Sequence, residues 1–266
     1  MIQLNVYPGG KKRIVTFSYD DGAPNDARLI EMFNKYGVKG TFHLNGGRYV
    51  NATEEEIMTL RQRYEGHEIA CHTIHHGWLT QMTRTSMVHE VFEDRAAVEK
   101  IAGHPVVGMS YPSGDFNPEV MELLASCDIK YSRTTLSTDR MMLPDNFLAW
   151  HPTCHHKNAL PLVEGFMNDL DSEWRRPLFY IWGHSHEFRT EEDWAYMEKV
   201  VSGLAGSEKI WYATNIEICD YITAAHQLRI SADETMVYNP TALDIWVEKN
   251  KKNIYRIPAG QTITLP

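Results

Sequence analysis

Four clusters of polar side chains, each directly after an apolar run, carry the residue types that could perform catalysis. The first contains the adjacent acids Asp20 and Asp21, followed by Gly22. Side chains alternate faces along a strand, but a glycine lets the chain bend so that both carboxylates can converge. Two close carboxylates repel each other, and a bound cation would relieve that repulsion. Taken alone, a helix cap or a turn explains either acid equally well.

The second cluster places three histidines within five residues, at positions 72, 75 and 76. His72 and His76 are four residues apart, so on one helical turn they share a face, which suits two imidazoles on one metal ion. Thr73 stands where the zinc-protease pattern has its glutamate. A lone histidine is usually packed or solvated, but three after an apolar run favour metal binding.

The third and fourth clusters follow later apolar runs. Ser110-Tyr111-Pro112-Ser113-Gly114 predicts a rigid loop whose backbone amides could face a site, although an ordinary turn explains it as well. The run from Ile181 to Glu187 contains His184. A histidine with a pKa near neutrality can protonate a leaving group, and a structural loop histidine is the competing interpretation.

The elements that must position these clusters alternate between strands and helices. The periodicity predicts strands over residues 13–19, 39–44, 68–72, 106–111, 131–133, 147–151, 178–182 and 210–213. Capping residues and helical periodicity predict helices over 26–35, 53–63, 86–102, 162–174 and 190–203, and from 117 and 214 onward.

This alternation predicts an α/β fold with a parallel sheet and right-handed crossovers. About seven strand–helix units are fewer than a closed eight-fold barrel needs, so we expect a distorted or incomplete (β/α) barrel over residues 1–226. Five short strands are predicted afterwards, over residues 228–230, 235–238, 244–247, 253–257 and 262–265. We expect residues 227–266 to form a small β appendage packed on the barrel.

The charge composition argues against two kinds of binding partner. The 266 residues carry 35 acidic and 26 basic side chains, a net charge of −9, which argues against nucleic acid and anionic membranes. No signal peptide or membrane-spanning run is visible, so a cytoplasmic location is the default expectation, although a chain already freed of an export signal would read the same. The four cysteines are widely spaced, and nothing sets the oligomeric state.

Together the clusters resemble the polysaccharide deacetylase (NodB-like) family, whose domain would span roughly residues 13–224. The family's Asp-Asp-Gly core, its His-Ser/Thr-x-x-His motif and its late histidine are matched, respectively, by Tyr19-Asp20-Asp21-Gly22, His72-Thr73-Ile74-His75-His76 and His184. The order and separation of the first two motifs are specific, whereas each motif alone would be weak.

The resemblance implies a metal-dependent hydrolase that removes an acyl group, from nitrogen or oxygen, from a carbohydrate-like substrate. Asp21, His72 and His76 would hold one divalent ion, with zinc as the first expectation. Asp20 would act as general base and His184 as general acid. The substrate side would be formed by Tyr111, Pro112, the Ser113 backbone N–H, Trp150 and Trp182, although core packing explains the three aromatic residues equally well.

The sequence also departs from the family pattern. Ser110 stands where the third motif has an arginine that orients the catalytic aspartate, and Ser113 stands at its tyrosine. The motif with paired Asp and Trp has only Leu148-Ala149-Trp150-His151-Pro152 as a counterpart, without the acids. A divergent member of the family is therefore expected.

Three rival functions remain at this point. Gly183-His184-Ser185 resembles the start of a nucleophile elbow, which would make Ser185 a serine nucleophile, but Glu187 replaces the second glycine. A metal-free amidase acting on a small cyclic amide would tend to lose the metal ligands, which are present. A catalytically inactive carbohydrate-binding relative would need neither Asp20 nor His184.

Overall fold

The computed structural model describes residues 1–172 and 177–266 and is built around one parallel sheet of eight strands. The strands are β2 (Arg13–Asp20), β3 (Gly40–Leu44), β4 (Glu68–Cys71), β5 (Gly108–Ser110), β6 (Tyr131–Arg133), β7 (Cys154–His155), β8 (Leu178–His184) and β9 (Ile210–Tyr212). Their order is β6-β5-β4-β3-β2-β8-β7, and β9 pairs with the first residues of β2. The sheet curls without closing, so the predicted incomplete barrel is confirmed.

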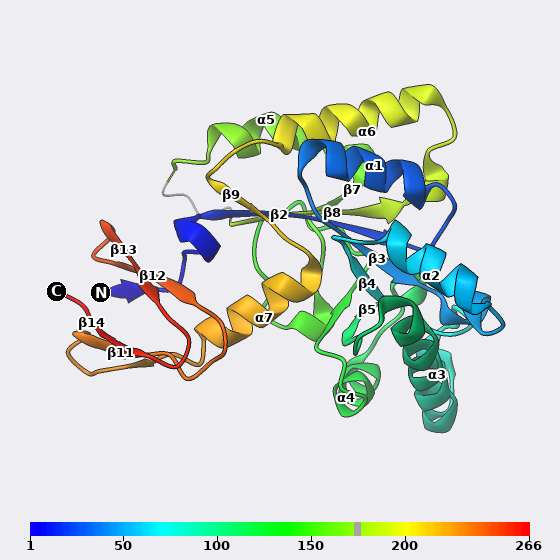
Figure 1. Cartoon of the computed structure of the whole chain (residues 1–266), viewed down its shortest axis with the longest axis horizontal. Coiled ribbons are helices and arrows are strands. Elements are labelled where there is room, and N and C mark those ends of the chain that lie inside the picture. Colours follow the sequence, from blue (N-terminus) through cyan, green and yellow to red (C-terminus); the bar gives the residue numbers. More distant parts are fainter. Residues whose placement is uncertain (173–176) are drawn as a thin grey trace.

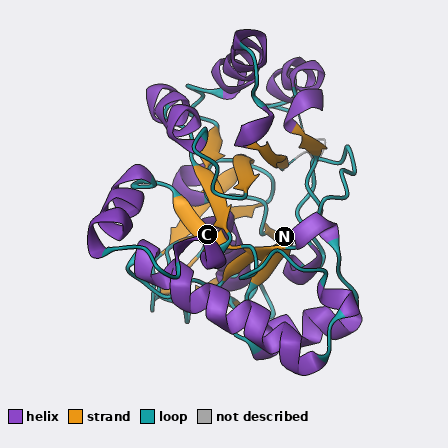
Figure 2. Ribbon diagram, turned by 90° about the vertical axis from the view of Figure 1, so that its right-hand side faces the viewer, coloured by secondary structure: helices purple, strands orange, loops and turns teal. Residues whose placement is uncertain are grey.

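The described part of the chain contains seven α-helices. They lie around the curled sheet (Figures 1 and 2). They are α1 (Asp26–Tyr36), α2 (Glu54–Arg63), α3 (Arg84–Ala102), α4 (Pro118–Ser126), α5 (Leu160–Asn168), α6 (Glu191–Leu204) and α7 (Asn215–Ala225). Figure 1 shows α5, α6 and α1 together along one side. Three capping boxes start helices where the sequence predicts them, at Thr53/Glu56, Thr190/Asp193 and Thr214/Glu217.

The central strand β2 is buried on both faces, yet its two faces differ in polarity. Val15, Phe17 and Tyr19 belong to the main hydrophobic core. The alternate residues point to a polar interior, where Thr16 donates to Asn215, and Ser18 contacts His43 on β3. This polar face leads along β2 to Asp20 at its carboxyl end, where sites of β/α barrels form.

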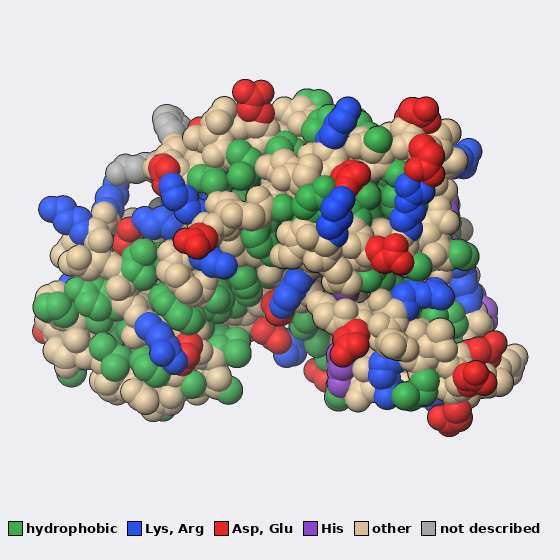
Figure 3. All heavy atoms as spheres, turned by 45° about the horizontal axis from the view of Figure 1, so that its top comes forward, with side chains coloured by type: hydrophobic (Ala, Val, Ile, Leu, Met, Phe, Trp, Pro, Cys, Tyr) green, Lys and Arg blue, Asp and Glu red, His purple; other side chains and the backbone are tan. Residues whose placement is uncertain are grey.

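The predicted five-strand tail is present as β10 (Arg229–Ile230), β11 (Met236–Tyr238), β12 (Ile245–Lys249), β13 (Asn253–Ile257) and β14 (Thr262–Thr264). These strands form two three-stranded sheets, β10-β11-β14 and β1-β12-β13. The additional strand β1 (Ile2–Gln3) comes from the other end of the chain, so both termini lie here (Figure 1). Figure 3 shows hydrophobic side chains gathered on this part of the surface and mixed charges elsewhere.

Three local predictions need correction. Residues 147–151 were expected to form a strand, but a 3₁₀ turn, η5 (Phe147–Ala149), forms because the Asn146 side chain accepts the Leu148 N–H. β7 was not predicted, since two residues carry no periodicity. The helix expected over 162–174 starts at Leu160 and ends at Asn168, and the last two positions of that range lie outside the described residues. No described helix is both long and apolar enough to cross a bilayer.

Candidate metal centre

The two adjacent acids converge because the chain turns sharply after β2. Asp21 has a left-handed backbone (φ 76°), and so does Gly22 (φ 59°). A left-handed conformation is uncommon for a residue other than glycine and often marks a functional site. The turn brings Asp21 round beside Asp20 instead of leaving it on the opposite face.

The two histidines also converge, but not through the helical turn that their spacing suggested. The segment after β4 is irregular, with left-handed residues at Thr73 (φ 59°) and His76 (φ 56°). These turns bring the His72 and His76 rings to 4.9 Å between centroids. The spacing therefore identified the pair, while a different backbone conformation brings it together.

Three predicted ligands meet in one place. His72 Nε2 and His76 Nε2 each lie 3.8 Å from Asp21 Oδ1, and the three ligand atoms are all within 4.8 Å of one another. Tetrahedral zinc with bonds near 2.1 Å separates its ligands by about 3.4 Å, so the set can close on an ion by small side-chain movements. The His72 side chain is buried, whereas the His76 side chain is 41% exposed. The three-ligand set is therefore open to solvent on the side of His76.

Surrounding groups fix the orientation of His72. Its Nδ1 lies 2.9 Å from the Ser110 carbonyl and 2.7 Å from the Ser110 hydroxyl, so Nε2 is left for Asp21 and an ion. Its backbone N–H donates to Asp94, and Asn45 donates to its carbonyl. Burial lowers the pKa of His72 to about 4, which favours the neutral imidazole that a metal needs.

Asp20 lies behind the three ligands and is 2% exposed. Its carboxylate accepts the Ser110 hydroxyl at 3.0 Å, lies 3.4 Å from His43 Nδ1, and pairs with the Arg133 guanidinium. Burial raises the pKa of Asp20, but Arg133, His72 and His43 outweigh it and hold that pKa well below its usual range. Asp20 is therefore ionised at neutral pH.

Arg133 is a residue that the sequence analysis missed. It lies at the end of β6, directly beside Ser110 in the parallel register. It is fully buried, and its guanidinium stacks over the Trp182 ring at 4.5 Å. Position 110 holds a serine where the family motif has an arginine. Arg133, on the neighbouring strand, provides a guanidinium that pairs with the Asp20 carboxylate. An arginine at the end of a short predicted strand was the available signal.

His184, at the end of β8, lies on the other side of Asp20, with Nε2 3.9 Å from Asp20 Oδ2. Its Nδ1 is 2.7 Å from Glu187 Oε1. Two residues on, His186 Nδ1 lies 3.8 Å from Asp21 Oδ2, and its side chain is 49% exposed. Neither Glu187 nor His186 was singled out, although both stand in the same short run as His184.

The predicted substrate-facing residues are only partly placed to meet a substrate. The Tyr111 and Trp150 side chains are fully buried in hydrophobic clusters, so the prediction that they face a sugar is wrong. Pro112 is buried, and Trp182 is 8% exposed beneath Arg133. Ser113 is exposed and left-handed (φ 55°), and among the described residues no group accepts its backbone N–H.

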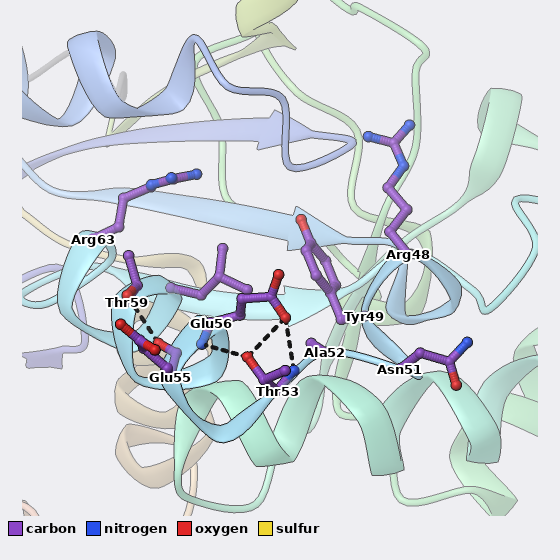
Figure 4. A pocket seen from close by; sticks show the side chains of 10 residues that line it. Arg48, Tyr49, Asn51, Ala52, Thr53, Glu55, Glu56, Thr59 and Arg63 are labelled. Carbon is purple, nitrogen blue, oxygen red and sulfur yellow. Dashed lines mark hydrogen bonds between the residues drawn. The ribbon is translucent and has the colours of Figure 1, made fainter.

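The open side of the centre is a depression of about 530 Å³, lined by Asp21, Asn45, Gly47, Arg48, Val50, Ile74, His75 and His76. A second depression adjoins it and shares Arg48 (Figure 4). Figure 4 shows Arg63 on one side of this second depression and Arg48 and Tyr49 on the other, with Glu56 bonded back to Thr53 in the α2 capping box. Arg48 also donates to the Asp21 carbonyl at 2.6 Å, which ties this rim to the ligands.

Comparisons with known proteins show which proteins the chain is similar to. The model of the polysaccharide deacetylase family matches residues 8–132. The chain is 27% identical over 112 residues to a peptidoglycan-N-acetylmuramic acid deacetylase from Bacillus subtilis, which is 41% of this chain and 23% of that protein. It is also 30% identical over 93 residues to a bifunctional xylanase/deacetylase from Pseudobutyrivibrio xylanivorans. That match covers 35% of this chain and 15% of that protein. The chain thus matches less than a quarter of each relative's length.

Solved structures share the fold at low sequence identity. A polysaccharide deacetylase structure from Mycobacterium smegmatis superposes with a TM-score of 0.63 at 18% identity, covering 83% of this chain and 93% of that one. A family 4 acetyl xylan esterase from Clostridium thermocellum, in complex with a cobalt ion, superposes with a TM-score of 0.54 at 18% identity. The superposition covers 77% of this chain and 90% of that one. The family match over residues 8–132 includes the two motifs that contain Asp20, Asp21, His72 and His76, so the resemblance to the polysaccharide deacetylase family is confirmed.

Proposed function

We propose that this chain is a metal-dependent hydrolase that removes an acetyl group from a carbohydrate. The observation that carries the proposal is the meeting of Asp21, His72 and His76 around one point, with Asp20 and His184 beside it. The names of the relatives point to N-acetylated or O-acetylated glycans as the substrate class.

The three ligand residues fit one divalent ion, and we propose zinc because one carboxylate and two imidazoles are a common zinc set. When bound, the ion supplies Lewis-acid polarisation of the acyl carbonyl and a lowered pKa of water. The open side at His76 leaves room for water and the acyl group.

The remaining residues divide the proton transfers between them. Asp20, held by Arg133 and Ser110, accepts the proton of the attacking water. We assign to the backbone N–H of the exposed residue Ser113 the stabilisation of negative charge on the former carbonyl oxygen. His184 donates a proton from Nε2 to the departing amine or alkoxide.

The serine-hydrolase alternative gains no support from the geometry. Ser185 is fully buried, and its hydroxyl donates to Asp26 at 2.5 Å, away from any open surface. The metal-free alternative is weakened because all three ligands are retained and meet.

Acetate release tests the proposal directly. The purified protein, stripped of metal with a chelator, should release no acetate from N-acetylated chito-oligosaccharides, peptidoglycan fragments or acetylated xylan. Added zinc or cobalt should restore release from at least one of them. Asp20→Asn should abolish release while one equivalent of metal stays bound, and Asp21→Ala should lose both. Full release in the presence of chelator would refute metal dependence.

A further inference from the structure

Glu187 occupies a position that the proposed reaction does not yet use. It is the last residue of the 3₁₀ turn η7 (Ser185–Glu187), three residues after His184, and its side chain is 16% exposed. Its Oε1 lies 2.7 Å from His184 Nδ1 and 3.2 Å from His155 Nε2. Its Oε2 pairs with the ammonium of Lys157. One carboxylate therefore joins the turn after β8 to the segment after β7.

The carboxylate is ionised in this setting. Burial raises the pKa of Glu187, but hydrogen bonds from His155, His184 and Lys157 outweigh it and hold that pKa well below its usual range. An ionised carboxylate can only accept hydrogen bonds. Nδ1 of His184 must then carry a hydrogen, which leaves Nε2 as the nitrogen that gains and loses a proton.

That assignment matters because Nε2 is the atom that faces the centre. It lies 3.9 Å from Asp20 Oδ2, whereas Nδ1 points away to Glu187. A histidine held at one nitrogen by a carboxylate keeps its tautomer and its ring orientation fixed. The same charge favours the imidazolium, the form that can donate a proton to a leaving group.

A second metal site is the competing interpretation of this cluster. His155, His156 and Glu187 offer three ligand atoms within 4.8 Å of one another. However, the Lys157 ammonium already pairs with Glu187 Oε2, and Oε1 already lies within hydrogen-bond distance of His184 and His155, so both oxygens have partners without an ion. The His156 ring is stacked against Tyr19 and Phe188, and burial lowers its pKa to about 3, so it adds no charge.

We propose that Glu187 is the positioning residue that fixes the tautomer of His184 and orients its Nε2 toward the reacting atoms, with Lys157 and His155 holding Glu187 in place. The catalytic meaning of this inference rests on the proposed hydrolase function, but the pairing itself can be measured without it.

Two substitutions should shift the pKa of His184 in opposite directions, which distinguishes this role from simple packing. Glu187 and His186 face His184 from its own turn, and Arg133 faces it from β6. Asp20 at the end of β2 and Asp21 just after it face it from a third side. His155 and Lys157 lie across Glu187. Burial lowers the pKa of His184, but Glu187 and the two aspartates outweigh it and raise that pKa above the usual value. Removing the Glu187 charge should lower this pKa, and removing the Lys157 charge should raise it.

The test is a histidine ¹⁵N NMR titration of the metal-loaded protein. In the wild type, His184 should show hydrogen on Nδ1 when neutral. In Glu187→Gln its pKa should fall by about one unit, and in Lys157→Met it should rise by a few tenths. Glu191→Gln, which removes an exposed carboxylate paired with Arg28, should change neither quantity. Lys157 is 59% exposed, so its variant stays informative even if Glu187→Gln fails to fold.

Kinetics add a readout that a structural role would not move. 4-Nitrophenyl acetate has a leaving group that needs no proton, whereas an N-acetyl glycan requires one. Glu187→Gln should lower kcat for the N-acetyl glycan 10-fold or more at pH 8, on the order of a general-acid effect, and leave kcat for the aryl ester within about 2-fold. The proposal would be overturned if the His184 pKa and tautomer were unchanged in both variants. It would also be overturned if the wild type bound a second metal equivalent that Glu187→Gln removes. A wild type inactive on every acetylated glycan would overturn the hydrolase proposal instead and leave the NMR result standing.

Discussion

At the scale of single residues, the centre is held by charges that come from neighbouring strands. Asp20 lies between His43 of β3 and His184 of β8 in the parallel register, and Arg133 reaches it from β6. Asp20, Asp21, His72, His76 and His184 could be found from the sequence because they stand in short contiguous motifs. Arg133 and His43 could not, because their proximity to Asp20 depends on strand order, and the contact between Glu187 and His184 depends on the turn that follows β8.

Replacing Arg133 tests this arrangement. Arg133→Met keeps much of the volume but removes the partner of a buried, ionised Asp20. We expect kcat for acetate release to fall by about 10- to 100-fold with metal still bound, and stability to fall by roughly 3 kcal/mol. Steady-state kinetics, metal analysis and urea unfolding measure these effects. Arg28→Met, which removes an exposed guanidinium, is the control, and wild-type turnover in Arg133→Met would contradict the assigned role.

At the scale of elements, the strands and helices were predictable where a periodic run ends in a clear cap. Thr53, Thr190 and Thr214 begin helices as expected. The turns after β2, β4 and β5 were not predictable in detail, because residues other than glycine adopt left-handed backbones there, including Asp21, His76 and Ser113. Those turns, more than the strands, decide where the functional side chains meet.

Gly183 links two of these elements in close contact. A Cβ at this position in β8 would lie 2.0 Å from Nδ1 of the buried His156 ring, which is stacked on Tyr19 and Phe188. Gly183→Ala should therefore destabilise the protein by about 1–3 kcal/mol and displace the segment that supports Glu187. Urea unfolding at constant pH gives the change in stability. Unaltered stability would mean that His156 can move aside freely.

At the scale of the whole molecule, buried acidic groups lie on the helices α1 and α3 as well as on the sheet. Asp26, Glu68 and Asp94 are buried, and burial is the first cause that raises the pKa of each to about 7. The incomplete barrel was predictable from the number of strand–helix units. This polar interior was harder to foresee, because strands buried on both faces usually read as continuous apolar runs.

These carboxyls give stability an unusual pH dependence. Their folded pKa values exceed the unfolded ones, so the folded state binds more protons and its stability falls as pH rises through 7. For Asp26 alone the loss between pH 6 and 8 is about 1 kcal/mol. Urea unfolding at a series of pH values gives the slope of the free energy of unfolding against pH. Asp26→Asn should remove the part of that slope that Asp26 contributes. A slope identical to that of the wild type would show that Asp26 is already ionised in the folded protein at pH 6.

The most direct measurement of the central claim is an anomalous difference map from crystals grown with zinc, recorded at the zinc edge. We predict one peak per chain, within bonding distance of Asp21, His72 and His76. A peak at His155, His156 and Glu187 instead, or none near Asp21 when zinc is in excess, would contradict the proposed centre.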